Sequence, residues 1–95
     1  MSADAEKLER DFEIINMRGL HARASVKFVQ TASGFDAEVE VSKDGVTVGG
    51  ASIMGLMMLA ASPGCCIHVA ASGPQRAEVL DALEALIAGK FGEGE

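Results

Sequence analysis

Aromatic residues are scarce in this sequence. The 95-residue chain has no Trp and no Tyr, and four Phe account for its whole 4% aromatic content. A domain of this size must therefore build its hydrophobic core from Val, Leu, Ile and Met together with those Phe residues. With 48% hydrophobic and 23% charged residues, the chain has the composition of one globular domain and not of a disordered segment.

A surplus of positive charge is also missing. Lys and Arg number 8 against 14 Asp and Glu, which gives a net charge of −6 at pH 7. Proteins that bind nucleic acids through the phosphate backbone usually carry a basic surplus, so this composition argues against nucleic acid as a partner.

Long hydrophobic runs and dispersed cysteines are missing as well. The longest apolar run covers residues 53–61 and includes a glycine, whereas a membrane span needs about 20 residues, so no membrane partner is expected. The first eleven residues lack the apolar segment of a secretory signal. The two cysteines are the neighbours Cys65 and Cys66, which cannot join distant segments. This usage indicates reduced thiols and a cytoplasmic protein.

Hydrophobic periodicity predicts seven elements in the order βαββαβα. Apolar residues three and four apart predict a helix from Ala22 that ends at Gly34, and Asp44-Gly45 between alternating segments predicts a hairpin. The order predicts an α/β (α+β) two-layer open-faced sandwich, with a four-stranded antiparallel sheet and three helices on one face. Residues 1–11 are expected to form a flexible extension and residues 12–93 a single domain. The other predicted elements are strands over 12–16, 35–41, 46–48 and 65–71, a helix over 53–60, and a final helix that follows Gly73-Pro74.

Acidic residues are absent from residues 14–35, although the chain is acidic overall. The same window contains Arg18, His21, Arg23 and Lys27, and the predicted helix begins within it. A helix N-terminus adds free backbone N–H groups and the positive end of the helix dipole. The combination predicts an anion site, for which phosphate is the usual ligand.

A second window without acidic residues, 45–77, contains a helix that is apolar nearly all round. A helix in a small two-layer fold can bury only one side. We expect Ser52 to be its N-cap, and Leu56 and Leu59 to face the core. The remaining apolar side chains would then form an exposed patch of the kind that binds partner proteins, namely Ile53, Met54 and Met57. The alternative is an unusually apolar core helix that binds nothing.

His21 lies at the predicted junction between a loop and a helix. A histidine in a loop is more often a surface residue or a cap than a reactive group. The neighbouring Arg23 favours a reactive role, because a cationic setting favours the neutral imidazole and would stabilise a phosphoryl group attached to it. The residues therefore predict a phosphate site and are compatible with a phosphorylated histidine.

Two separate motifs resemble those of one known family. The segment Gly19-Leu20-His21-Ala22-Arg23 is similar to the active-site signature of HPr, the histidine phosphocarrier of the phosphoenolpyruvate-dependent phosphotransferase system. The segment 52–57 resembles the signature around the family's regulatory serine, and the closing Phe91-Gly92-Glu93 is also similar. The resemblance spans about residues 12–93 and implies the same βαββαβα sandwich.

The resemblance implies a function and a set of site residues. His21 would accept a phosphoryl group on Nδ1 from phospho-Enzyme I and pass it to an Enzyme IIA-type protein, while Arg23 stabilises the phosphohistidine. Such a protein is a carrier and not a stand-alone enzyme. The family's docking surface for both partners would correspond to Val26, Ile53, Met54 and Met57.

The chain departs from the family pattern at two positions. Ala24 stands where the family usually has Pro, which restores a backbone N–H in the first helical turn. Ala51 precedes Ser52, where members regulated by a serine kinase commonly carry Lys or Arg. The resemblance implies phosphorylation of Ser52 by an HPr kinase/phosphorylase, which would place negative charge beside the docking patch. A simple N-cap at Ser52 needs no kinase.

Other interpretations remain open from sequence alone. The downstream pathway is either sugar uptake or a regulatory, nitrogen-type relay. A regulatory module of the same fold could bind partners without phosphate, and a small ligand-binding sandwich is a third reading. Cys66 and His68 would share one strand face, but no further ligand is evident, so neither metal nor cofactor is expected. We expect a monomer.

Overall fold

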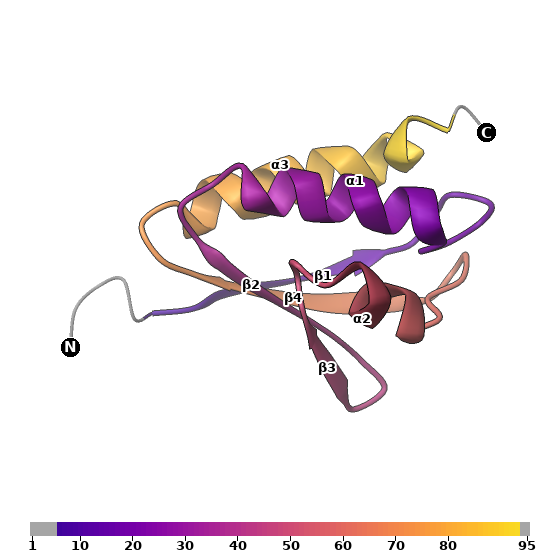
Figure 1. The fold of residues 1–95 in the computed structure, drawn as a ribbon, viewed down its shortest axis with the longest axis horizontal. Coiled ribbons are helices and arrows are strands. Elements are labelled where there is room, and N and C mark those ends of the chain that lie inside the picture. Colours follow the sequence, from indigo (N-terminus) through magenta and orange to yellow (C-terminus); the bar gives the residue numbers. More distant parts are fainter. Residues whose placement is uncertain (1–5, 94–95) are drawn as a thin grey trace.

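A single antiparallel sheet forms one layer of the protein (Figure 1). The computed structural model describes residues 6–93. The strand order across the sheet is β1-β4-β2-β3, and each neighbouring pair is antiparallel. The predicted order βαββαβα and the open-faced sandwich are confirmed. The elements are β1 (Leu8–Glu13), α1 (Ala22–Ser33), β2 (Glu38–Lys43), β3 (Val46–Gly49), α2 (Ile53–Met58), β4 (Cys66–Ser72), α3 (Arg76–Ala88) and the 3-10 turn η2 (Lys90–Gly92).

The helices cover one face of this sheet. Helices α1 and α3 lie side by side above the strands, and α2 packs against α1 and β3 (Figure 1). Alternate residues of the central strands point into this layer, which is why Val41, Ile67 and Val69 are fully buried. No helix within residues 6–93 is long and apolar enough to cross a membrane.

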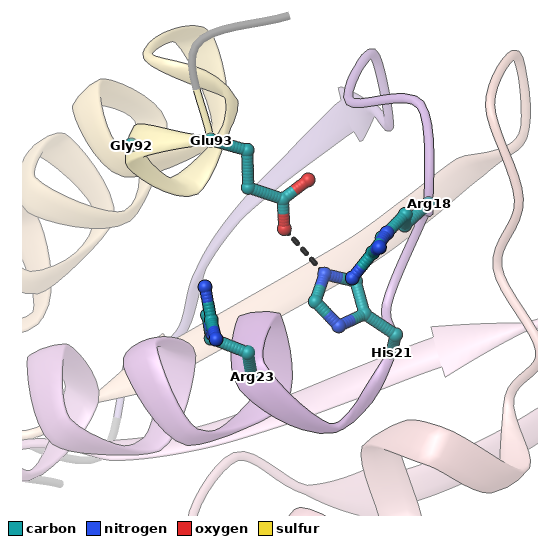
Figure 2. Close-up of a pocket in the computed structure, with 5 residues that line it drawn as sticks. All are labelled: Arg18, His21, Arg23, Gly92 and Glu93. Atoms are coloured by element: carbon teal, nitrogen blue, oxygen red, sulfur yellow. Dashed lines mark hydrogen bonds and ion pairs between the residues drawn. The ribbon is translucent and has the colours of Figure 1, made fainter.

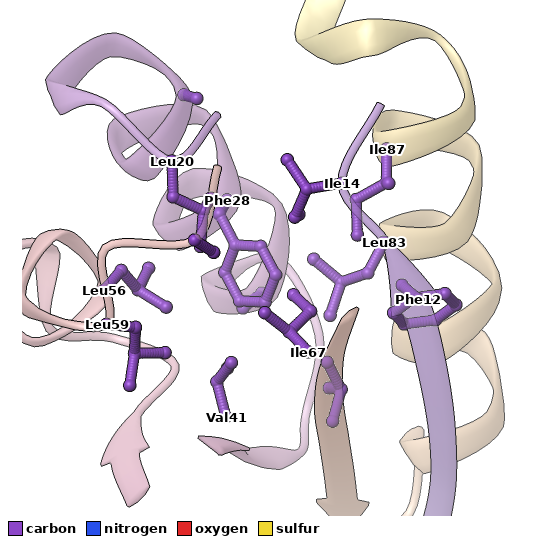
Figure 3. Close-up of a cluster of buried hydrophobic side chains, with 14 of the residues drawn as sticks. Phe12, Ile14, Leu20, Phe28, Val41, Leu56, Leu59, Ile67, Leu83 and Ile87 are labelled. Carbon is purple, nitrogen blue, oxygen red and sulfur yellow. The ribbon is translucent and has the colours of Figure 1, made fainter. Parts of the chain in front are cut away.

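The core between the two layers is made of aliphatic side chains and phenylalanine (Figure 3). Phe28 fills its centre, and Phe12 and Phe91 are also buried. The expectation that methionine contributes to the core is wrong for the described residues. The four described methionines are exposed, because three belong to the outer side of α2 and its end and the fourth to the loop after β1. They are Met17, Met54, Met57 and Met58.

Strand β1 begins earlier than the sequence suggested. We expected a strand over 12–16 and a flexible extension over 1–11, but Leu8–Asp11 already pair with β4. The sequence did not indicate a strand here because this part of it is rich in charged residues. In the structure those side chains have partners on other elements. Arg10 pairs with Asp81 and Glu84 of α3 at 2.8 and 3.1 Å. Residues 1–5 of the expected extension lie outside the described part of the chain.

The second and third strands form the predicted hairpin. Asp44 and Gly45 both have positive φ, 51° and 82°, which is the backbone twist that a two-residue hairpin turn requires. Strand β2 begins at Glu38, three residues later than expected at Phe35. The residues before it, Phe35–Ala37, form a bend whose backbone packs against the turn at Gly73.

The open face of the sheet carries a histidine between two carboxylates. His68 of β4 contacts Asp11 through Nδ1 at 2.7 Å and Glu9 through Nε2 at 2.6 Å. Both acids belong to β1, so the three side chains link the edge strand to its neighbour. Hydrogen bonding to Glu9, and then to Asp11, raises the pKa of His68 above its ordinary value of 6.5.

The raised pKa predicts a loss of stability at alkaline pH. Protonated His68 is stabilised in the fold, so its contribution is complete below pH 6.5 and disappears as the pH rises through the raised value. The free energy of unfolding, measured in urea from pH 6 upward, should therefore fall in the native protein. It should fall less in His68→Gln, which cannot titrate. Parallel pH profiles for the two proteins would contradict this role of His68.

Candidate functional site

His21 is the N-cap residue of α1, and its side chain does not cap the helix. Its backbone is extended, with φ −76° and ψ −178°, and its carbonyl accepts the first helical hydrogen bond from the N–H of Ser25. The imidazole is therefore available for other contacts at the positive end of the helix dipole. Ala24, at the position of the family's usual Pro, is fully buried in the first helical turn.

The loop before His21 is held against the segment that follows α2. Leu20 is buried, and its N–H donates to the carbonyl of Ala61 at 2.9 Å. Gly19 has a φ of +65° and lies directly on the backbone of Ala61 and Ser62. A side chain would not fit there, so the glycine lets the loop approach closely and sets the position at which His21 leaves it.

The segment 90–93, which follows α3, lies on the other side of His21. Phe91 is buried in the core and anchors η2 there. Lys27 of α1 donates from Nζ to the carbonyl of Phe91 at 2.5 Å. These two contacts fix the backbone immediately before Glu93.

The Glu93 carboxylate contacts the imidazole of His21 directly. Its Oε2 accepts from Nε2 of the ring, across 72 residues of sequence (Figure 2). A carboxylate only accepts, so the neutral ring carries its hydrogen on Nε2 and keeps its lone pair on Nδ1. The basic residues expected around His21 are joined by an acid that the sequence pattern did not show, because Glu93 from a distant part of the sequence reaches the ring.

A pocket of about 300 Å³ surrounds this pair. Arg18 and Arg23 flank His21 in it, and both side chains come from exposed positions (Figure 2). His21 and Arg23, which the sequence predicted to lie together, line the same pocket, and Gly92 and Glu93 complete the lining. Two guanidinium groups beside a neutral imidazole can hold the oxygens of a phosphoryl group while the ring nitrogen bonds to phosphorus.

Asn16 is a polar residue of this site that sequence reasoning did not single out. It is completely buried, and its Nδ2 donates to the carbonyl of Gly19 at 2.8 Å and to Oε1 of Glu93 at 3.1 Å. An asparagine at the end of an apolar run indicates only a turn. No local pattern could have shown that Asn16 and Glu93 meet, since the contact depends on the packing of α1 against α3.

The predicted docking patch lies on α2. Ser52 is its N-cap, and its Oγ accepts from the N–H of Gly55 at 3.0 Å. Leu56 and Leu59 are buried as predicted. Helix α1, which packs against α2, contributes the half-buried Val26. The predicted exposed residues are indeed exposed, with Ile53 at 37%, Met54 at 71% and Met57 at 40%, and Met58 extends them at 75%.

The cysteines are free thiols and belong to no cluster of metal ligands. Within residues 6–93, no group of three or more His, Cys, Asp or Glu side chains is arranged to hold a metal ion. Cys65 lies beside Ser62 at 3.4 Å, and this hydrogen bond lowers the pKa of its thiol.

Comparison with known proteins agrees with the geometry. Residues 8–89 match the family model described as "PTS HPr component phosphorylation site". The chain is 57% identical to phosphocarrier protein HPr of Neisseria meningitidis over 88 residues, which cover 93% of this chain and 99% of that protein. The chain belongs to the HPr family.

Further HPr proteins extend the comparison to other bacteria. HPr of Cupriavidus necator is 52% identical, with 93% of this chain and 99% of that protein covered. A crystal structure of HPr from Thermoanaerobacter tengcongensis matches with a TM-score of 0.86 and 45% identity, covering 90% of this chain and 97% of that one.

The class of function follows from membership in the HPr family. The protein is a histidine phosphocarrier of the phosphotransferase system, and it is a carrier component and not a catalytic enzyme. Its partners are accordingly components of that system, of the Enzyme I and Enzyme IIA types.

The close approach of the loop at Gly19 predicts a large cost for a side chain there. Gly19→Ala would place a methyl group against the Ala61 carbonyl and 2.9 Å from Ser62 Cα, and should lower the free energy of unfolding by about 3 kcal/mol or more. Gly45→Ala is the matched control, because that glycine also has positive φ but nothing within 4 Å. It should cost about 1 kcal/mol. Equal losses in urea unfolding would contradict the close contact.

Proposed function

We propose that His21 is the phosphoryl acceptor and that Nδ1 is the reacting atom. The observation that carries this proposal is the contact between Glu93 and Nε2, because it leaves Nδ1 as the ring nitrogen with a lone pair. The donor is an Enzyme I-type phosphoprotein, charged ultimately by phosphoenolpyruvate. The acceptor is an Enzyme IIA-type protein.

The transfer step needs no proton to move. The lone pair of Nδ1 forms a bond to phosphorus, and the bond between phosphorus and the donor breaks with its electron pair returning to the donor. The ring of His21 then carries phosphorus on Nδ1, hydrogen on Nε2 and a positive charge. The Glu93 carboxylate beside Nε2 stabilises that charge, and on transfer to the acceptor a neutral imidazole leaves.

Arg23 and Arg18 are assigned to the phosphoryl oxygens. Both line the pocket around His21, and a guanidinium can present paired N–H donors to a phosphoryl group. Charge that spreads over those oxygens during transfer is stabilised by groups already in place. The N–H groups at the start of α1 add to the same positive field.

The exposed apolar surface on α2 is assigned to partner docking. It consists of Ile53, Met54 and Met57, with Val26 of α1 beside it. A carrier must bind its donor and its acceptor in turn, so each interface has to be small and easily released. Flexible methionine side chains suit a surface that fits two different partners. The proposal also holds that the protein is a cytoplasmic monomer. Its docking surface then stays accessible to both partners.

Ser52 is assigned as a regulatory phosphorylation site as well as the N-cap of α2. Its hydroxyl is at an exposed position immediately before the docking surface. A phosphate there would add about −1.5 to −2 charges beside Ile53 and Met54, which would oppose the burial of that surface by a partner. An HPr kinase/phosphorylase would be the modifying enzyme. It would have to recognise a site with Ala51 before Ser52, where kinase-regulated members of the family commonly carry Lys or Arg.

The acceptor assignment predicts which histidine is phosphorylated. Incubation with phosphoenolpyruvate and Enzyme I should give an acid-labile phosphoprotein, which mass spectrometry or a radiolabel detects. The adduct should be absent from His21→Ala. His68→Ala is the matched control, since the sequence has only these two histidines, and it should be phosphorylated normally. An adduct of undiminished amount in His21→Ala would reject the assignment.

The docking assignment predicts that a charge on the exposed surface of α2 weakens binding. Met54→Glu should raise the dissociation constant for Enzyme I by about tenfold or more, because the interface would have to desolvate a carboxylate. Val46→Glu is the control, since Val46 is an equally apolar exposed residue at the β2–β3 turn, outside the docking surface. Calorimetry should show unchanged binding for that variant. Equal effects of the two substitutions would refute a specific docking surface on α2.

A further inference from the structure

Asn16 is the one buried amide in the immediate surroundings of His21. It has no exposed surface, and it occupies the loop between β1 and α1. Its side chain donates two hydrogen bonds from Nδ2, one to the carbonyl of Gly19 and one to Oε1 of Glu93. Its Oδ1 is buried and has no hydrogen-bond partner among residues 6–93.

This arrangement is unfavourable for a residue that only fills space. A buried acceptor without a partner lowers stability, and an apolar side chain of similar size would avoid that loss. The two donated bonds are therefore the useful property of Asn16. One of them fixes the loop that carries His21, and the other reaches the carboxylate that contacts His21.

The two oxygens of Glu93 have different partners. Oε1 accepts from Asn16, and Oε2 accepts from Nε2 of His21. A carboxylate that is held at one oxygen cannot rotate freely, so the second oxygen is directed at the imidazole. Asn16, Glu93 and His21 thus form a chain of hydrogen bonds that starts in the core and ends at the ring.

We propose that Asn16 is a positioning residue for phosphoryl transfer. Through Glu93 it fixes the tautomer of His21 that has hydrogen on Nε2 and the lone pair on Nδ1, which is the reacting atom. This inference rests on the proposed function of His21 as phosphoryl acceptor. Asn16 is not among the residues that line the pocket beside His21, so it acts on the ring through Glu93.

The same chain acts in both directions of transfer. Before transfer, it keeps Nδ1 unprotonated and open. After transfer, the carboxylate keeps the hydrogen on Nε2, so the bond between Nδ1 and phosphorus breaks with its electron pair returning to a ring that leaves as neutral imidazole. Loss of the Nε2 hydrogen would instead require an imidazolate anion to leave, which is much less favourable. A carboxylate that fixes a histidine tautomer is an established device in acyl transfer, and here an amide fixes the carboxylate.

The tautomer of His21 can be measured without any partner protein. We would compare the native protein with Asn16→Ala, Glu93→Gln and the double variant, using ¹⁵N chemical shifts of the imidazole at a pH at which the ring is neutral. The ratio of the Nε2–H to the Nδ1–H form should fall by about tenfold or more in each variant, as expected for loss of one hydrogen bond to a charged group. Because Asn16 acts through Glu93, the double variant should show no larger change than Glu93→Gln.

Ser25→Ala is the matched control. Ser25 is also fully buried, and its Oγ donates to the carbonyl of Leu20 at 3.3 Å in the same loop, whereas its hydrogen bonds within residues 6–93 do not include Glu93. It should leave the tautomer ratio unchanged, whereas an equal fall in this variant would reduce Asn16 to a structural role and overturn the inference. An unchanged ratio in folded Asn16→Ala would overturn it too, and so would additive effects in the double variant.

The experiment remains decisive if Asn16→Ala does not fold. Glu93→Gln alters a side chain at the end of the chain and leaves the core intact, so an unchanged ratio in that variant is sufficient to reject the inference. Phosphorylation of the native protein is assayed separately. If His21 is phosphorylated and the ratio does not respond, the inference fails and the proposed function stands. If native His21 takes no phosphoryl group, the proposed function fails whatever its tautomer.

Discussion

The contact between the Glu93 carboxylate and Nε2 of His21 is the interaction on which the site depends. It requires two residues that are 72 positions apart to meet within hydrogen-bonding distance. Helices α1 and α3 must lie side by side, and Phe91 must be buried so that Glu93 reaches His21 at the start of α1. The bond from Lys27 to Phe91 then holds that turn in place. The fold thus brings a carboxylate from one end of the domain sequence to a ring nitrogen at the other.

Acidic and basic side chains gather at different places on this protein. The protein has a net charge of −6, and the open face of the sheet carries Glu9 and Asp11 around His68. The start of α1 carries Arg18 and Arg23 with the positive end of the helix dipole. Because fields from exposed charges fall off within about 10 Å in salt, an acidic protein can keep a locally cationic phosphate site.

Local patterns predicted most of this fold, and long-range packing explains where they failed. The spacing of apolar residues located α1 and α3, and Asp44-Gly45 located the hairpin, because each signal depends only on neighbouring residues. The start of β1 was missed because its charged side chains are satisfied by α3 and β4, which no local window contains. His21 and Arg23 could be identified because their proximity is local. They are two residues apart at the start of a helix and line one pocket. The roles of Asn16 and Glu93 depend entirely on the packing of distant elements.

A phosphocarrier places opposite demands on the two nitrogens of one imidazole. The nitrogen that receives phosphorus must be open to two large partners in turn. The protein therefore cannot bury this nitrogen or occupy it with a hydrogen bond of its own. Orientation then has to come from the other nitrogen, which can face the protein because no partner needs to reach it. Glu93 meets this need from the C-terminal turn, and the buried amide of Asn16 fixes it without entering the pocket. The apolar surface of α2, which we propose for docking, lies outside this chain of hydrogen bonds, so docking there would leave the ring undisturbed. The separation of docking from positioning follows from this one chemical requirement.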